Sequence, residues 1–239
     1  MKVGEKVVLM LDDGDGFAAA ISGGLHPNPN SKFNVEKGWF ELSLEQYGLV
    51  NRNAIGEMIH FVGPDGGYEV SIVILHKNEP PILACALNEL LSELSRNALS
   101  KMPSLIIPFI LPEYKLKQEN KIESEMVSVY GIKFGPTTDL TEALSSRLQK
   151  APPYMQIYHE GLAELLHLAN IVKLPTVVLV GVINQHRSNK TAREEIEVTC
   201  EIGDLLASTL SVSFSKEKTS QSVTKSSSDN KEAWRALYG

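Results

Sequence analysis

The segment T-V-V-L-V-G-V-I, residues 176–183, constrains the fold more than any other part of the chain. It is apolar at odd and even positions alike, so both faces of the strand that it predicts must be buried. Such strands lie inside sheets that helices cover on both sides, and those sheets are mostly parallel. The segment therefore predicts an inner parallel strand of an α/β fold.

Helical and strand-like segments alternate around this strand. Residues 7–11 and 104–111 are apolar runs, and residues 126–134 alternate, so we expect three further strands there. Residues 17–21 are expected to form a strand beside the first. Helical spacing or capping signals predict a helix that begins near residue 82 and helices over 137–151, 153–174 and 191–210, the first of these three with Thr138 as its cap. The alternation predicts a three-layer α/β sandwich with a central mixed sheet.

The first half also carries a hairpin signal. The turn sequence G-P-D-G-G, residues 63–67, separates the apolar residues 58–62 from Tyr68–Leu75, which is rich in β-branched residues. This pattern predicts an antiparallel hairpin. W-F-E-L-S-L, which begins at Trp39, is a weaker strand candidate. Pro108 in the run 104–111 predicts that the end of that strand is irregular or exposed.

After Phe214 the composition turns to Ser, Lys and Thr with few apolar residues. Such a composition predicts disorder, and we divide the chain into an α/β domain, 1–212, and a flexible tail, 213–239. The tail ends in W-R-A-L-Y-G, although a solvated tether has no folding reason to carry Trp234, Leu237 and Tyr238.

A C-terminal Leu237-Tyr238-Gly239 has the chemistry that a pocket on a partner can capture. The carboxylate pairs with a lysine, the tyrosine brings area and one hydroxyl, and the leucine fills an apolar slot. A tether of about twenty residues would let these residues search on the order of 25 Å from the domain. In the competing interpretation, Trp234 and Leu237 pack on the chain's own domain, and the protein is a plain interaction module.

One motif suggests catalysis. In V-V-L-M-L-D-D-G-D-G-F a hydrophobic strand leads to Asp13 and Asp15, which resembles the opening of haloacid-dehalogenase-type phosphatases. There the first aspartate attacks phosphorus and the second is the acid/base, with Mg²⁺ between them. Such a site needs a further acidic pair, and Asp204 has no acidic neighbour to complete one. We therefore favour a tight acidic turn at 12–16, with Gly14 and Gly16 at positive φ, and keep the phosphatase as the alternative.

The other candidate sites are weak. His159 and His167 are eight positions apart, too far for a two-ligand clamp on one helix, and the sequence has no phosphate-binding glycine loop or nucleophile elbow. The loop 184–193, with Arg187, Lys190 and Arg193, is either an anion site at a strand end or a solvated turn. We therefore expect no catalytic residues, no metal and no cofactor.

Net charge and cysteine usage limit the classes of partner and the cellular compartment that we expect. The net charge is −6 without a dense basic block, which argues against a nucleic-acid binder. The two cysteines, Cys85 and Cys200, lie far apart in apolar stretches and are expected to be small buried hydrophobes. They form no disulfide framework, which fits a reducing compartment, the cytoplasm or the nucleus. No apolar run reaches the length of a membrane span.

The second half resembles the proteasome assembly chaperone 1 family. The resemblance rests on the strand 105–111, the helix with G-L-A-E-L-L-H-L-A-N-I-V-K-L-P, the strand T-V-V-L-V-G-V-I and the helix that begins at Thr191. The ending Leu237-Tyr238-Gly239 agrees with the hydrophobic–tyrosine–any residue ending of that family.

The resemblance implies a phosphorylase-like α/β domain without catalytic residues. It implies a heterodimer with proteasome assembly chaperone 2 that promotes assembly of the α subunits of the 20S proteasome into rings. In that interpretation Leu237 and Tyr238 insert between adjacent α subunits, and the carboxylate of Gly239 pairs with a lysine of the pocket.

Overall fold

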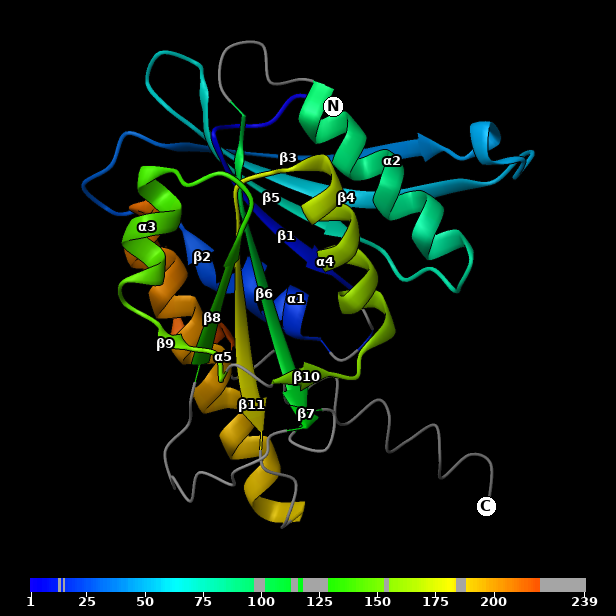
Figure 1. Ribbon diagram of the computed structural model, residues 1–239. Helices are drawn as coiled ribbons and strands as arrows, with labels where there is room; N and C mark the ends of the chain where they lie inside the picture. Colours follow the sequence, from blue (N-terminus) through cyan, green and yellow to red (C-terminus); the bar gives the residue numbers. More distant parts are fainter. Residues whose placement is uncertain are drawn as a thin grey trace, which may run out of the picture.

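The computed structural model describes residues 1–12, 14, 16–96, 102–112, 116–117, 129–152, 155–183 and 188–219. Helices cover both faces of a central mixed sheet, which confirms the predicted three-layer α/β sandwich (Figure 1). The helices are α1 (Phe17–Gly24), α2 (Ile82–Arg96), α3 (Asp139–Ser145), α4 (Glu160–Val172) and α5 (Ser188–Leu210), with one 3₁₀ turn, η1 (Glu45–Tyr47).

The central sheet has eight strands in the order β3-β4-β5-β1-β6-β11-β8-β9. Their bounds are β1 (Lys6–Leu11), β3 (Asn34–Ser43), β4 (Asn53–Val62), β5 (Tyr68–Leu75), β6 (Ser104–Pro112), β8 (Val129–Phe134), β9 (Gln149–Lys150) and β11 (Thr176–Ile183). Two short ladders pair β2 (Leu25–His26) with β12 (Ser213–Phe214), and β7 (Leu116–Lys117) with β10 (Gln156–Ile157).

The centre of the sheet is parallel and its two flanks contain antiparallel pairs. β5, β1, β6 and β11 run parallel, whereas β3, β4 and β5 form an antiparallel meander and β8 runs antiparallel to β11. The predicted inner strand is therefore confirmed as β11, parallel to its neighbour on one side only. The predicted hairpin is also confirmed, because β4 and β5 pair across the loop 63–67.

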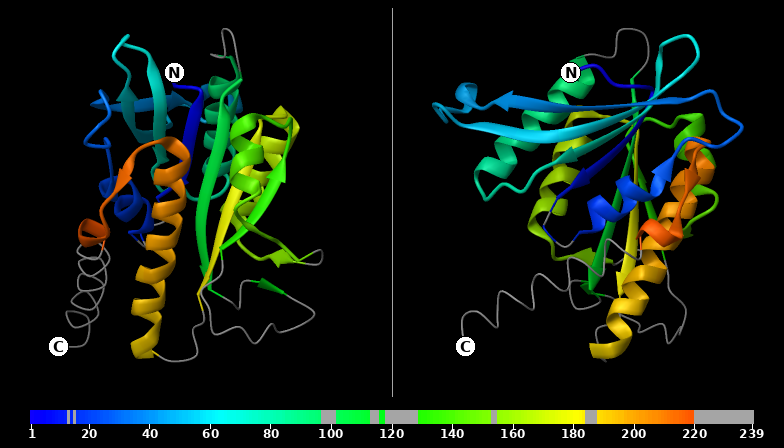
Figure 2. Two further views of the ribbon diagram at one scale, coloured as in Figure 1. Left: turned by 90° about the vertical axis from the view of Figure 1, so that its left-hand side faces the viewer. Right: turned by 180° about the vertical axis from the view of Figure 1, so that it is seen from behind.

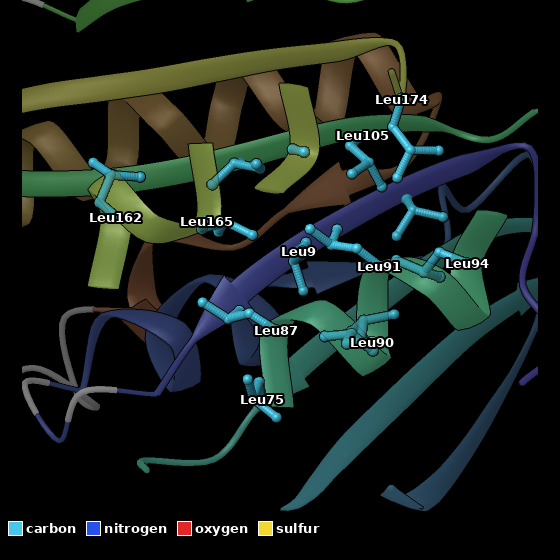
Figure 3. Close-up of a cluster of buried hydrophobic side chains, with 14 of the residues drawn as sticks. Leu9, Leu75, Leu87, Leu90, Leu91, Leu94, Leu105, Leu162, Leu165 and Leu174 are labelled. Carbon is cyan, nitrogen blue, oxygen red and sulfur yellow. The ribbon is translucent and has the colours of Figure 1, made fainter. Parts of the chain in front are cut away.

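Alternation along β1 divides the core into two halves. Val7 and Leu9 point to the face that α2 and α4 cover, and Val8 and Met10 point to the face of α1, α3 and α5. On the first face, leucines of α2 and α4 surround Leu9 (Figure 3). Fully burying one leucine contributes about 1.5–3 kcal/mol, so these two layers account for much of the stability.

The prediction of a strand at 17–21 is wrong. These residues begin α1, which follows Gly16 in a left-handed conformation at φ 82°. The segment F-A-A-A-I is short and apolar, a pattern that a strand and a buried helix share. Its three alanines have the highest helix propensity of any residue and decide for the helix.

Several helix boundaries differ from the prediction. The helix expected over 153–174 begins only at Glu160, because the side chain of His159 caps it, and residues 156–157 form β10 instead. α5 begins at Ser188 rather than 191, and the helix expected from 137 covers only Asp139–Ser145. Its predicted cap, Thr138, is confirmed by a reciprocal capping box with Thr141.

Pro108 lies inside β6 rather than at an irregular end. The N–H of Ser104 points toward β1 and that of Leu105 toward the β11 side, so even-numbered residues of β6 direct their N–H groups toward β1. The pairing of β1 with β6 stops at Ile106, however, while the pairing with β11 continues to Pro112. Pro108, which has no N–H, therefore sits where no partner strand needs that donor.

The described chain remains packed beyond residue 212, where the sequence places the end of the domain. Ser213 and Phe214 pair with β2, and the side chain of Thr219 is fully buried. Residues 220–239, with the predicted docking residues Leu237, Tyr238 and Gly239, lie outside the described residues.

Candidate functional site

The carboxyl ends of β5, β1 and β6 border a cleft. β1 pairs with β5 along its whole length but leaves β6 after Ile106, so β1 and β6 separate toward this end. The chain order also reverses here, because α2 connects β5 to β6 on the other side of β1. Such a switch point is where open α/β sheets bind ligands.

The cleft has a volume of about 300 Å³ and is mostly apolar. It is lined by Leu11, Asp12, Leu75, His76, Lys77, Asn78, Pro80, Leu83, Phe109, Tyr158, His159, Glu160 and Gly161. Gly161 lets α4 approach α2 closely, because a Cβ there would lie 3.2 Å from Leu83 Cδ2. The volume suits a small molecule or a few side chains of a partner.

His159 holds one wall of the cleft in place. Its Nδ1 accepts the N–H of Leu162 at 3.1 Å, which caps α4, and its ring meets Phe109 edge-on at 4.8 Å between centroids. Since Nδ1 is an acceptor, the neutral ring carries its proton on Nε2. The imidazole therefore has a structural role that the sequence does not signal, because histidine is not among the preferred cap residues.

His76, which also lines the cleft, has two contacts of its own. Its Nε2 lies 3.3 Å from Glu57 Oε1, and its ring meets Trp39 edge-on at 5.6 Å. His60, in contrast, is a buried core residue whose Nδ1 lies 2.8 Å from Ser71 Oγ and whose ring stacks on Tyr68. Burial lowers the pKa of His60 below its usual value.

The acidic turn that follows β1 has the backbone that the sequence predicts. Gly14 and Gly16 have φ of 84° and 82°, and Asp12 Oδ1 accepts the N–H of Gly14 at 3.2 Å. Asp13 and Asp15 lie outside the described residues. Asp204 is on α5, where its carboxylate pairs with Lys216 at 2.7 Å. The described part of the chain therefore gives no support to the phosphatase alternative.

The remaining candidates add no chemistry. Burial raises the pKa of the Cys200 thiol, which makes it a poorer nucleophile. Arg193, expected in the loop 184–193, lies on α5 and pairs with Glu197 at 2.9 Å, and residues 184–187 lie outside the described residues. Across the described ranges, no group of three or more His, Cys, Asp or Glu side chains could hold a metal ion. Nor does any helix of that part combine the length and the apolar composition of a membrane span.

An exposed apolar surface lies on the antiparallel flank of the sheet. Trp39 is 70% exposed, and Val35 of the same strand and Ile55 of β4 are 42% and 48% exposed. β3 is the outermost strand, and the β3–β4 hairpin extends away from the body of the sheet with η1 at its tip (Figures 1 and 2). We call four exposed side chains on one side of β3, which are Val35, Lys37, Trp39 and Glu41, the β3 face.

The sequence itself contains a signal for this exposed surface. In W-F-E-L-S, Phe40 and Leu42 occupy alternate positions and are buried on the face of α2, so Trp39 and Glu41 must point to the other side. A tryptophan that shares a strand face with a glutamate is therefore an exposed tryptophan. Large exposed apolar side chains that cluster indicate a contact surface.

Solved structures with the same fold come from archaea and bacteria. A protein of unknown function from Thermoplasma acidophilum has a TM-score of 0.55 at 12% identity, over 99% of this chain and 90% of that one. PbaB, an archaeal proteasome activator from Pyrococcus furiosus, has a TM-score of 0.51 at 11% identity, over 100% and 96%. PbaA of the same organism, an archaeal homolog of proteasome-assembly chaperone, has a TM-score of 0.50 at 14% identity, over 100% and 94%.

At these identities the likeness concerns the fold. No curated protein matches the sequence. One family model, described as "Domain of unknown function (DUF7894)", matches residues 1–239. Since that match spans the whole sequence, the chain belongs to the DUF7894 family.

Proposed function

We propose that this chain is a non-catalytic chaperone that promotes assembly of the 20S proteasome. The observation that carries the proposal is the fold, which PbaA and PbaB share over all of this chain and nearly all of their own length. Those two proteins are an archaeal homolog of proteasome-assembly chaperone and an archaeal proteasome activator. The likeness spans the three layers of the domain and so exceeds a shared motif.

Three polar residues that line the cleft make local contacts. His159 caps a helix, His76 pairs with Glu57, and Asp12 closes its own turn. These contacts hold the walls of the cleft in place. The exposed Trp39 and Ile55 instead favour a protein as the ligand.

The finer features of the proposal come from the resemblance to proteasome assembly chaperone 1. The chain acts on intermediates of the α-subunit ring, in the cytoplasm or the nucleus, as a heterodimer with a protein of the proteasome assembly chaperone 2 type. Leu237 and Tyr238 enter a pocket between adjacent α subunits, and the carboxylate of Gly239 pairs with a lysine there.

Deletion of residues 237–239 tests the docking role. The full chain and the truncated chain are used to capture partners from native lysate, and the proteasome α subunits are quantified by mass spectrometry. We expect the truncated chain to recover at least about tenfold less α subunit, since a lost aromatic anchor with its charge pair costs about 1.4 kcal/mol or more.

The matched control deletes three tether serines, Ser226, Ser227 and Ser228, which shortens the tail equally and keeps its end. This control should recover as much α subunit as the full chain. Equal recovery by the full chain and the chain that lacks 237–239 would remove the docking role of the tail. Recovery of no α subunit by any of the three would contradict the proteasome role itself.

A further inference from the structure

β3 has a backbone edge that no other described strand covers. It is the first strand of the sheet and pairs with β4 alone among the described strands. The N–H of Leu44 donates to the carbonyl of Arg52 at 3.1 Å, so even-numbered residues in this register direct their polar groups toward β4. Odd-numbered residues, including Lys37, Trp39 and Glu41, therefore direct their N–H and C=O groups outward. An open edge of this kind is a template for another strand.

The side chains of the same odd-numbered residues form the β3 face. Trp39 lies at its centre and is 70% exposed, and Lys37 and Glu41 are both exposed and flank it at equal spacing, two residues away on either side. Glu41 already accepts a hydrogen bond from the side chain of Asn53. Because that side chain is neutral, the bond does not neutralise the charge of Glu41. The pattern cation–tryptophan–anion is its own complement when the strand direction is reversed.

We propose that β3 pairs antiparallel with β3 of a second copy of this chain, about a two-fold axis through Trp39. Directly opposite residues in an antiparallel pair share a face. This register places Trp39 against Trp39 of the second copy and Lys37 against Glu41, and symmetry repeats that ion pair on the other side of the axis.

The alternative registers are less favourable. An axis through Lys37 or Glu41 places like charges directly opposite each other, which destabilises a strand pair. An axis through Gly38 sets Lys37 against Trp39 and Val35 against Glu41, so neither charge meets its opposite. The charges therefore select the axis at Trp39, as register is generally set by the pattern on the faces.

The backbone agrees with this register. Outward-directed residues meet outward-directed residues, so Val35 faces Ser43 of the second copy, Lys37 faces Glu41, and Trp39 faces itself. Each such pair exchanges two hydrogen bonds, which gives about ten across the interface. The pairing joins the two central sheets into one continuous sheet and shields the exposed tryptophan.

This contact does not depend on the proteasome role. It uses a second copy of the chain and needs neither the tail nor a heteromeric partner. Loss of tail-dependent capture would leave self-pairing untouched, and loss of self-pairing would leave tail-dependent capture measurable.

A charge exchange on the full chain tests the proposal. The dissociation constant of the dimer is measured by analytical ultracentrifugation for wild type, Lys37→Glu, Glu41→Lys and the double variant. Each single variant turns two attractive pairs into two repulsive ones. We therefore expect the dissociation constant of the dimer to rise by about tenfold or more. The double variant restores opposite charges and should return to within about threefold of wild type.

The matched control is Lys150→Glu, an exposed lysine on β9 at the opposite edge of the sheet. It should dimerise like wild type, and circular dichroism checks that every variant is folded. A wild-type chain that stays monomeric at about 100 μM, well above the dissociation constants of specific dimers, overturns the proposal. So do single variants that dimerise like wild type, or a double variant that fails to recover.

Discussion

Replacement of Gly181 by alanine tests how closely α5 packs on the central sheet. A Cβ at position 181 would lie 2.3 Å from Val198 Cγ1 of α5, 3.2 Å from Ile202 Cδ1 and 3.5 Å from Ile110 Cγ1. Carbon atoms pack at about 3.5–4.0 Å, so the first contact is more than about 1 Å too short. Val198 is fully buried and cannot move into solvent.

The expected loss of folding stability follows from this geometry. Overpacking by one methyl group in a dense core costs about 1–3 kcal/mol, and the short contact with a stiff β-branched residue places Gly181→Ala near the upper end. Val198→Ala alone removes two methyl groups and leaves a small cavity, a loss of about 2 kcal/mol. If the sites were independent, the double variant would lose about 4–5 kcal/mol.

We expect the double variant to lose only about 2 kcal/mol, because the new methyl group fills the space that Val198 vacates. Urea unfolding followed by circular dichroism gives the free energies, and unchanged m-values confirm that the variants expose the same surface. Gly23→Ala in α1 is the control. A Cβ there meets nothing within 4 Å, so this variant should be neutral or slightly more stable. Additive losses in the double variant, or a neutral Gly181→Ala, would refute the close packing of α5 on β11.

Two histidines give further predictions. Because burial lowers the pKa of His60, the folded chain resists a proton that the unfolded chain accepts below its ordinary pKa of about 6.5. Wild type should therefore lose more stability than His60→Gln as the pH falls from 7 to 5, which urea unfolding at each pH measures, and parallel curves would contradict the burial of the imidazole. His159→Ala removes both the cap of α4 and the ring contact with Phe109, whereas His159→Asn keeps a capping group, so the alanine variant should be less stable by about 1 kcal/mol in urea unfolding. Equal stabilities would mean that the cap contributes nothing.

The sequence predicts those elements of the fold whose pattern lies entirely within one short segment. The run 176–183 is apolar on both faces, and only an inner strand satisfies that pattern, so β11 follows from its residues alone. The turn 63–67 joins two segments of the right length and fixes the β4–β5 hairpin. α2 follows from leucines at helical spacing, which the structure places against Leu9.

Other parts depend on contacts between distant segments. F-A-A-A-I is apolar enough for a strand, and only its position after Gly16 and its alanines make it a helix. The start of α4 depends on His159, whose capping role and contact with Phe109 no sequence rule signals. The cleft exists because β1 and β6 separate after Ile106, and that separation belongs to the whole sheet rather than to any one segment. Trp39 could have been recognised as exposed from its alternation with Phe40, but its edge position could not, because strand order is a property of the assembled sheet.

The proposed chaperone role is tested most directly by proteasome assembly in cells that express this chain. Newly made α subunits are pulse-labelled, and their passage through ring intermediates into the 20S particle is followed on native gels with and without the chain. We expect that loss of the chain delays formation of the 20S particle and that misassembled α-subunit complexes accumulate, and that reintroduction of the full chain reverses both effects. Identical assembly kinetics with and without the chain would contradict it.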